Sequence, residues 1–121
     1  MHIEITSQGF PMTSALRTYA SRRLQPSLGL ARDCARRVRV ILSDQNGPRG
    51  GLDKRCRIAI SVAGAPTLVI DDVQADMYSA IDRASGRALR TLARRLSRRR
   101  SHRSAATARE PSAEEASSAE E

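Results

Sequence analysis

The sequence DMYSAIDRASGRALRTLARRLSRRR, residues 76–100, carries most of the information on fold and function. At 100° per residue on a helix, five arginines fall within an arc of about 80°. We call these five residues the arginine stripe: Arg83, Arg87, Arg90, Arg94 and Arg98. Apolar residues lie broadly opposite, at Met77, Ile81, Ala84, Ala88, Leu92 and Leu96. Because Asp76 has a side chain that caps helix N-termini, the pattern predicts a helix from Asp76 to about Arg100, with one side packed on a sheet.

The charge of this predicted helix is one-sided. Nine arginines and no carboxylate lie from Arg83 to Arg103. A solvated helix face normally mixes signs, because Glu–Lys pairs four residues apart stabilise a helix and like charges destabilise it. A polyanion would relieve the repulsion along the stripe. We therefore interpret the stripe as a binding surface for a polyanion rather than as a solvated face.

The first part of the chain predicts one strand and one helix. Residues 2–6 alternate polar and apolar side chains, which is typical of a short half-buried strand. Thr13 is a suitable N-cap for a helix that continues through about Leu24. Pro26 and Gly29 are then expected to end it, since proline and glycine disfavour helix interiors.

The middle of the chain predicts three further strands. Residues 37–42 alternate, as do residues 55–62, and the turn-rich segment SDQNGPRGGLDK, residues 43–54, is predicted to be a long hairpin loop between them. After a turn at residues 64–66, residues 67–73 are predicted to be the fourth strand. The order β-α-β-β-β-α predicts an α+β domain, a four-stranded, largely antiparallel sheet with both helices packed on one face.

The overall charge supports a polyanion partner. The chain has 21 Lys and Arg residues against 13 Asp and Glu, a net charge of +8, and all but one of the basic residues are arginine. Residues 1–104 alone hold 20 basic and 8 acidic side chains, a net charge of +12. Nucleic acid and an acidic membrane are the two candidate partners. The membrane is the less favoured, because the apolar side of the last helix is needed for the core.

The composition divides the chain into two parts. We expect one folded domain over residues 1–103, and a disordered tail rich in Ala, Ser and Glu over residues 104–121, which lacks the apolar groups that offset the entropy cost of ordering. The chain has only three aromatic residues, Phe10, Tyr19 and Tyr78. Base stacking is therefore not expected to be the main mode of binding.

The side chains that usually carry catalysis do not form a site in this sequence. His2 and His102 lie at opposite ends of the predicted domain, and Cys56 shares the inward side of its strand with apolar residues. Asp71 and Asp72 are adjacent on a strand and point to opposite faces. The cysteines and histidines also lack metal-ligand spacing. We therefore expect no enzyme, no cofactor, no metal and no small-molecule substrate.

The start of the last helix resembles a known family. Residues 76–82, DMYSAID, are similar to the D-M-Y-x-A-I-D run of the bacterial ribosome hibernation-promoting factor and ribosome-associated inhibitor family, at the start of its second helix. The opening I-x-I-T strand at residues 3–6, Thr13, and Ala-Leu-Arg at residues 15–17 agree with this resemblance, which covers about residues 1–100. The chain looks like a short member, without the C-terminal domain of long members.

The resemblance implies a fold, a target and a set of binding residues. Members of this family fold as β-α-β-β-β-α and bind the small ribosomal subunit near the decoding region, where they occupy the mRNA and tRNA channel during stationary phase or stress. Their contacts to rRNA come from basic residues on the two helices. By position, the rRNA-binding residues expected here are Arg22, Arg23, Arg83, Arg87, Arg90, Arg94 and Arg95.

Three features depart from the family pattern. The helix residues are arginine where family members often have lysine, the second hairpin has a Gly-rich loop, and an acidic tail follows the domain. The tail leaves open whether the protein promotes or opposes ribosome pairing.

We therefore expect a cytoplasmic translation-silencing factor that is monomeric off the ribosome and acts by occlusion without chemistry. The sequence leaves two alternatives: a general RNA- or DNA-binding module not specific to ribosomes, and an adaptor whose tail recruits a protein. No signal peptide or apolar run long enough to span a membrane is visible, so a reduced cytoplasm is the simple interpretation.

Overall fold

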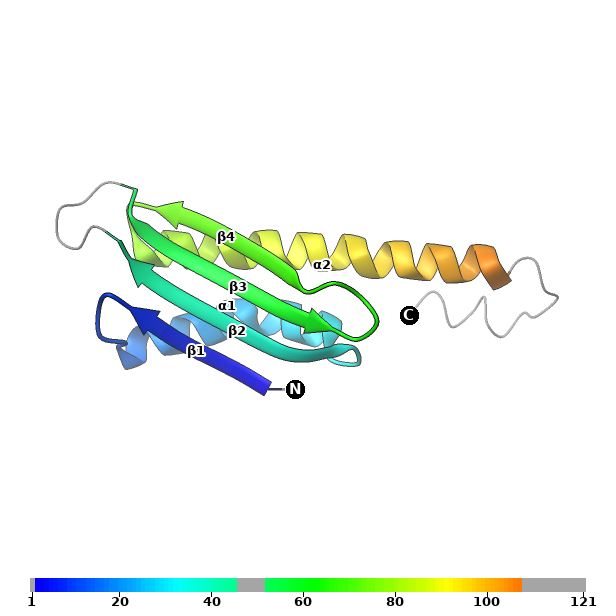
Figure 1. Cartoon of the computed structure of the whole chain (residues 1–121), viewed down its shortest axis with the longest axis horizontal. Coiled ribbons are helices and arrows are strands. Elements are labelled where there is room, and N and C mark those ends of the chain that lie inside the picture. Colours follow the sequence, from blue (N-terminus) through cyan, green and yellow to red (C-terminus); the bar gives the residue numbers. More distant parts are fainter. Residues whose placement is uncertain (1, 46–51, 108–121) are drawn as a thin grey trace.

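A computed structural model of the chain describes residues 2–45 and 52–107, with side chains as far as residue 98 (Figure 1). The elements in chain order are β1 His2–Gln8, α1 Ser14–Ala31, β2 Ala35–Asp44, β3 Lys54–Val62, β4 Leu68–Gln74 and α2 Met77–Thr107. This order confirms the predicted β-α-β-β-β-α arrangement. Of the predicted hairpin loop, residues 43–54, residues 46–51 lie outside the described residues, while β2 continues to Asp44 and β3 begins at Lys54.

The four strands form one sheet in the order β1-β2-β3-β4. β1 pairs with β2 in parallel, since α1 crosses over between them, and the two remaining pairings are antiparallel. The register aligns Ile5, Val40, Ile58 and Ile70 in one row across all four strands. All four are at most 6% exposed. The prediction of a largely antiparallel sheet is therefore confirmed.

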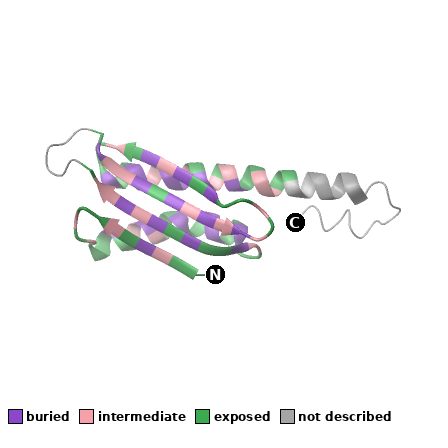
Figure 2. Cartoon of the chain, in the orientation of Figure 1, coloured by how far each residue is buried: buried purple, intermediate pink, exposed green. Residues whose placement is uncertain are grey.

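Both helices cover the same face of the sheet (Figure 1). α2 packs on β3 and β4 and also contacts α1. Along β2, β3 and β4 buried residues alternate with more exposed ones, as Figure 2 shows, because successive side chains point to opposite faces. Leu24 of α1, Ile81 and Leu92 of α2 and Val38 of β2 are at most 1% exposed. Each such side chain contributes about 1.5–3 kcal/mol through burial.

Helix α1 is longer than the sequence predicts. The expectation that it ends at Pro26 and Gly29 is wrong, because the helix continues through both residues to Ala31. Pro26 lies exposed on the outer side of α1, and its missing N–H removes one helical hydrogen bond. The residues that follow, Leu28 and Ala31, are buried against the sheet. Their packing outweighs the local cost of the proline.

Both predicted helix caps are confirmed. The backbone N–H of Leu16 donates to Thr13 Oγ1 at 3.1 Å, and that of Ser79 donates to Asp76 Oδ2 at 3.0 Å. Helix α2 then continues to Thr107, past the predicted end near Arg100. Of the tail predicted over residues 104–121, residues 104–107 continue α2 and the rest lie outside the described residues.

Candidate nucleic-acid interface

The arginine stripe lies on the solvent side of α2. The side chains of Arg83 and Arg87 are 64% and 45% exposed, whereas Ala84, Ala88 and Leu92 on the opposite side are fully buried. This arrangement confirms the predicted division of the helix into a core side and a charged side. Helix α2 also extends beyond the end of the sheet, as Figure 1 shows. The helix therefore presents its charge along the outside of the domain.

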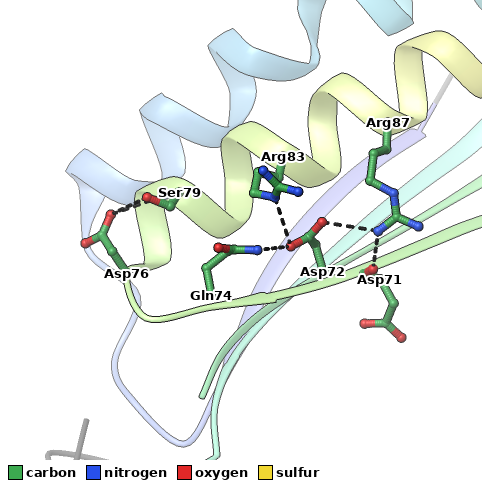
Figure 3. Close-up of polar contacts among 7 residues, drawn as sticks. All are labelled: Asp71, Asp72, Gln74, Asp76, Ser79, Arg83 and Arg87. Atoms are coloured by element: carbon green, nitrogen blue, oxygen red, sulfur yellow. Dashed lines mark hydrogen bonds and ion pairs between the residues drawn. The ribbon is translucent and has the colours of Figure 1, made fainter. Parts of the chain in front are cut away.

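A buried carboxylate neutralises part of the stripe (Figure 3). Asp72 lies on the core-facing side of β4 and is 8% exposed. Gln74 Nε2 donates to Asp72 Oδ1 at 2.7 Å, and Arg87 Nη1 donates to Asp72 Oδ2 at 3.1 Å. Arg83 Nε lies 3.8 Å from Asp72 Oδ1. Arg87 Nη1 also donates to the backbone carbonyl of Asp71 at 2.7 Å, so its guanidinium is held against the edge strand.

The repulsion along the stripe is therefore relieved in part within the fold, at Arg83 and Arg87. No acidic residue follows them in the sequence as far as Arg103. Their partner is Asp72, which reaches both arginines from β4. A signal for this pair is present in the sequence. Asp72 continues the inward alternation of Leu68 and Ile70, and a carboxylate at a core-facing position requires a charged or hydrogen-bonding partner.

A second carboxylate joins the two helices. Tyr19 of α1 donates its hydroxyl to Asp82 Oδ1 of α2 at 2.5 Å, and Arg23 Nε lies 2.9 Å from the same oxygen. The hydrogen bond raises the pKa of the Tyr19 hydroxyl, because ionisation would lose the bond and place an anion beside the carboxylate. The rings of Tyr19 and Tyr78 pack edge to face with centroids 4.8 Å apart. These contacts fix the spacing of α1 and α2 near their N-terminal ends.

The remaining predicted residues have no carboxylate partner among the described side chains. Arg22 and Arg90 are exposed and form no ion pair within that part of the chain. Arg94 Nη2 lies 3.4 Å from the hydroxyl of Thr91 on its own helix, and Arg95 Nη1 donates to the carbonyl of Pro66 at 2.8 Å. Arg22, Arg90 and Arg94 are thus the predicted residues with the most available charge.

The predicted residues do not all lie together. Arg83, Arg87 and Arg90 line one small hollow on α2. Arg22 lines a different, wider hollow beside Tyr19 and Tyr78 at the start of both helices. Arg95 points toward the turn between β3 and β4, where Pro66 holds it. The structure therefore brings part of the predicted set together on α2 and places the rest around it.

The open face of the sheet carries charges that pair with one another. Arg55 donates to both carboxylate oxygens of Asp71, at 2.6 and 2.5 Å, and Arg57 lies 3.9 Å from the same side chain. The hydrogen bonds from Arg55 lower the pKa of Asp71. Arg39 Nε lies 3.0 Å from Glu4 Oε1 in the same way. Arg55 and Arg57 therefore point away from the core, and this face offers less available charge than α2.

The chemistry of a catalytic or metal site is not visible in the described residues. Within residues 2–45 and 52–107, no group of three or more His, Cys, Asp or Glu side chains is arranged to hold a metal ion. Cys56 is fully buried, as expected, and burial raises the pKa of its thiol to about 12. In the same part of the chain, no helix combines the length and apolar character needed to cross a membrane.

Fold and surface together define a small α+β domain with its positive charge displayed along the outer side of one long helix. Residues 3–100 match the family described as sigma 54 modulation protein / S30EA ribosomal protein. The chain belongs to this family of ribosome-associated proteins, and the match confirms the resemblance carried by the DMYSAID run.

Solved structures share the fold over most of the domain. A ribosomal subunit interface protein from Coxiella burnetii is 25% identical, with a TM-score of 0.64 over 78% of this chain and 96% of the other. The N-terminal domain of Protein Y from Thermus thermophilus is 26% identical, with a TM-score of 0.63 over 78% of this chain and 98% of that domain. The curated proteins contain no match to the sequence.

Proposed function

We propose that this chain is a ribosome hibernation factor that binds small-subunit rRNA near the decoding region and blocks the mRNA and tRNA sites during stress or stationary phase. One observation carries the proposal. The solvent side of α2 displays Arg90 and Arg94, exposed and without a carboxylate partner in the described part of the chain. Membership of the ribosomal protein family favours rRNA over other polyanions.

The mechanism is occlusion without chemistry. Guanidinium groups of α2 contact rRNA phosphates, and each contact releases condensed counterions, which makes affinity fall steeply with salt. From Arg83 to Arg98 the stripe extends about 22 Å along the helix axis, at 1.5 Å per residue. The exposed guanidinium groups suit phosphate contacts because each presents several donors in a fixed plane. The bound domain then excludes mRNA and tRNA sterically.

The deciding experiment reverses charge where the fold does not depend on it. The variant Arg90→Glu/Arg94→Glu is measured for cosedimentation with purified small subunits at several salt concentrations. Arg87 is left intact because it is bound to Asp72. We expect affinity to fall at least about tenfold and the salt dependence to become shallower, since each lost phosphate contact removes about 0.7–0.9 from the slope of log K against log salt.

A charge-matched control distinguishes the loss of a specific binding site from the effect of a lower net charge. Arg32→Glu/Arg36→Glu makes the same change at two exposed residues outside α2. This control is expected to keep most of the wild-type affinity. Unchanged binding by a folded Arg90→Glu/Arg94→Glu protein would overturn the proposal, as would an equal loss in both variants.

Competition separates ribosome binding from general nucleic-acid binding. Labelled protein bound to small subunits is challenged with an excess of duplex RNA and, separately, of duplex DNA. A ribosome factor stays bound, because its surface matches one RNA shape, whereas a general module is displaced in proportion to the competing phosphate. An accompanying translation assay should show that protein synthesis stops as subunits become occupied.

A further inference from the structure

Gly86 is a glycine that the fold does not require. It lies well inside α2, where glycine is less favourable than alanine because it loses more conformational freedom. Among the described residues the glycines with positive φ are Gly9 and Gly64, so Gly86 has ordinary helical geometry. Apart from its chain neighbours and the nearby helix backbone, a Cβ built at Gly86 would meet one atom within 4 Å, Nη1 of Arg90 one turn further along α2, at 3.4 Å. At Gly9 the same addition would lie 2.8 Å from the carbonyl oxygen of Asp44.

The space above Gly86 is a hollow with positive walls. It has a volume of about 170 Å³ and is lined by Asp82, Arg83, Gly86, Arg87 and Arg90. The one carboxylate among these residues accepts from Tyr19 and pairs with Arg23, so its charge is directed toward α1 and largely balanced there. Asp72 offsets part of the charge of Arg83 and Arg87, and Arg90 adds a cation without a carboxylate partner in the described residues, so the hollow remains net positive.

One of the arginines is already held in position, and a second lies near the same carboxylate. Asp72 and the carbonyl of Asp71 fix Arg87 from the β4 side, and Asp72 lies 3.8 Å from Arg83. Arg90 has no ionic partner in the described part of the chain. An anion that enters the hollow thus meets the anchored Arg87 on one side and the available Arg90 on the other, which reduces the side-chain entropy lost on binding.

We propose that Gly86, Arg83, Arg87 and Arg90 form a seat for one phosphodiester group of an RNA backbone. The missing side chain at Gly86 lets the phosphate approach the helix backbone, where a methyl group would hold it away from the guanidinium groups. This inference rests on the proposed function and deepens it, since it assigns a particular contact within the interface. It also explains why a less favourable helix former occupies a half-buried position where an alanine would have room.

The test uses a substitution that should stabilise the fold and weaken binding. Gly86→Ala is expected to raise the melting temperature by a few degrees, on the order of 4 °C. It is also expected to weaken cosedimentation with small subunits at least about fivefold, because the added methyl occupies the contact space. Gly86→Gln, with a longer side chain that still favours helix, should weaken binding further. Loss of binding in a protein that melts higher excludes misfolding as the cause.

Gly29 provides the matched control. It is an exposed glycine in α1 with no atom within 4 Å of an added Cβ, and it lies outside the hollow. Gly29→Ala and Gly29→Gln should also raise the melting temperature and should leave subunit binding unchanged. Wild-type affinity for small subunits in both Gly86 variants would overturn the proposed phosphate seat. If Arg90→Glu/Arg94→Glu still weakens binding in that case, the proposed function stands and only this inference fails.

Free phosphate presents the same oxyanion, so one arm of the experiment examines it alone. Wild type and Gly86→Ala are melted in inorganic phosphate and in chloride at equal ionic strength. We expect the same shift for both proteins, because a single phosphate lacks the neighbouring contacts that an RNA backbone makes along α2. A phosphate-specific stabilisation confined to wild type would assign the hollow to a free anion and overturn the proposal.

Discussion

Arg87 Nη1 lies 3.1 Å from Asp72 Oδ2, and this pair joins the outer surface of α2 to the edge strand of the sheet. The carboxylate is 7% exposed as a side chain and the arginine 45% exposed. One partner thus belongs to the core and the other to the surface. A desolvated carboxylate without a cation would destabilise the fold. The solvent-facing Arg87 therefore also stabilises the sheet, through Asp72.

The substitution Asp72→Asn should lower the free energy of unfolding by about 1–2 kcal/mol, because it removes the charge from the hydrogen bond with Arg87. Urea unfolding followed by circular dichroism measures the change. Asp33→Asn alters an exposed carboxylate instead and serves as the control. Equal urea midpoints for Asp72→Asn and wild type would show that the pair does not stabilise the fold.

Acid should remove the contribution of the Asp71–Arg55 pair. The pKa of Asp71 in the folded protein is lowered, first by the hydrogen bonds from Arg55. A lowered folded-state pKa stabilises the protein above the unfolded-state pKa, near 3.8, and this stability is lost as the pH falls through the folded-state pKa. Above pH 5 the free energy of unfolding of wild type should therefore exceed that of Asp71→Asn. The difference should be less than about 1 kcal/mol, since the pair is partly exposed.

Unfolding free energies of both proteins between pH 2 and pH 7 provide the measurement for this pair. The two curves should separate above about pH 5 and converge in acid. A difference that persists unchanged at the lowest pH would contradict an ionic origin.

Replacing the helical proline should stabilise α1. Pro26→Ala restores a hydrogen-bond donor inside the helix, and we expect a net gain of about 2 kcal/mol after the loss of proline's restriction on the unfolded chain. Thermal and urea unfolding test this, with the neighbouring exposed substitution Gln25→Ala as the control. A lower stability of Pro26→Ala would mean that α1 is curved around the proline in a way that the sheet requires.

The two cysteines should differ in reactivity. Burial, with a smaller contribution from Asp72, raises the pKa of Cys56 to about 12, whereas Cys34 is half-buried. Iodoacetamide at pH 8 should therefore label Cys34 first and Cys56 at least about 100-fold more slowly. Mass spectrometry of digested protein gives both rates. Labelling in guanidinium chloride should remove the difference, and comparable rates in the folded protein would place Cys56 outside the core.

Alternation and capping residues made much of the fold predictable. Strands β2 and β3 follow from the regular alternation around Val40 and Ile58, and both helix starts follow from Thr13 and Asp76. These signals are local, so they need no knowledge of distant contacts. The family match then confirms the resemblance seen in the DMYSAID run.

The parts that could not be predicted depend on tertiary contacts. Pro26 and Gly29 are local signals for a helix end, but the burial of Leu28 and Ala31 on the sheet overrides them. Likewise the arginines of the interface follow from helical spacing. The pairing of Arg87 with Asp72 does not, because Asp72 lies on β4 and the contact depends on how the helix packs on the sheet. The role of each predicted rRNA-binding arginine remains a prediction that the binding experiments address.

Among the residues of α2 whose side chains are described, the last fully buried one is Leu92, and the helix continues to Thr107 beyond the sheet. From Leu96 to Thr107 the backbone advances about 16 Å. Adding or removing a turn after Arg98 would change how far the helix extends by about 5.4 Å and would leave the described core residues in place. The fold therefore separates the length of the projecting end of α2 from the packing that stabilises the domain.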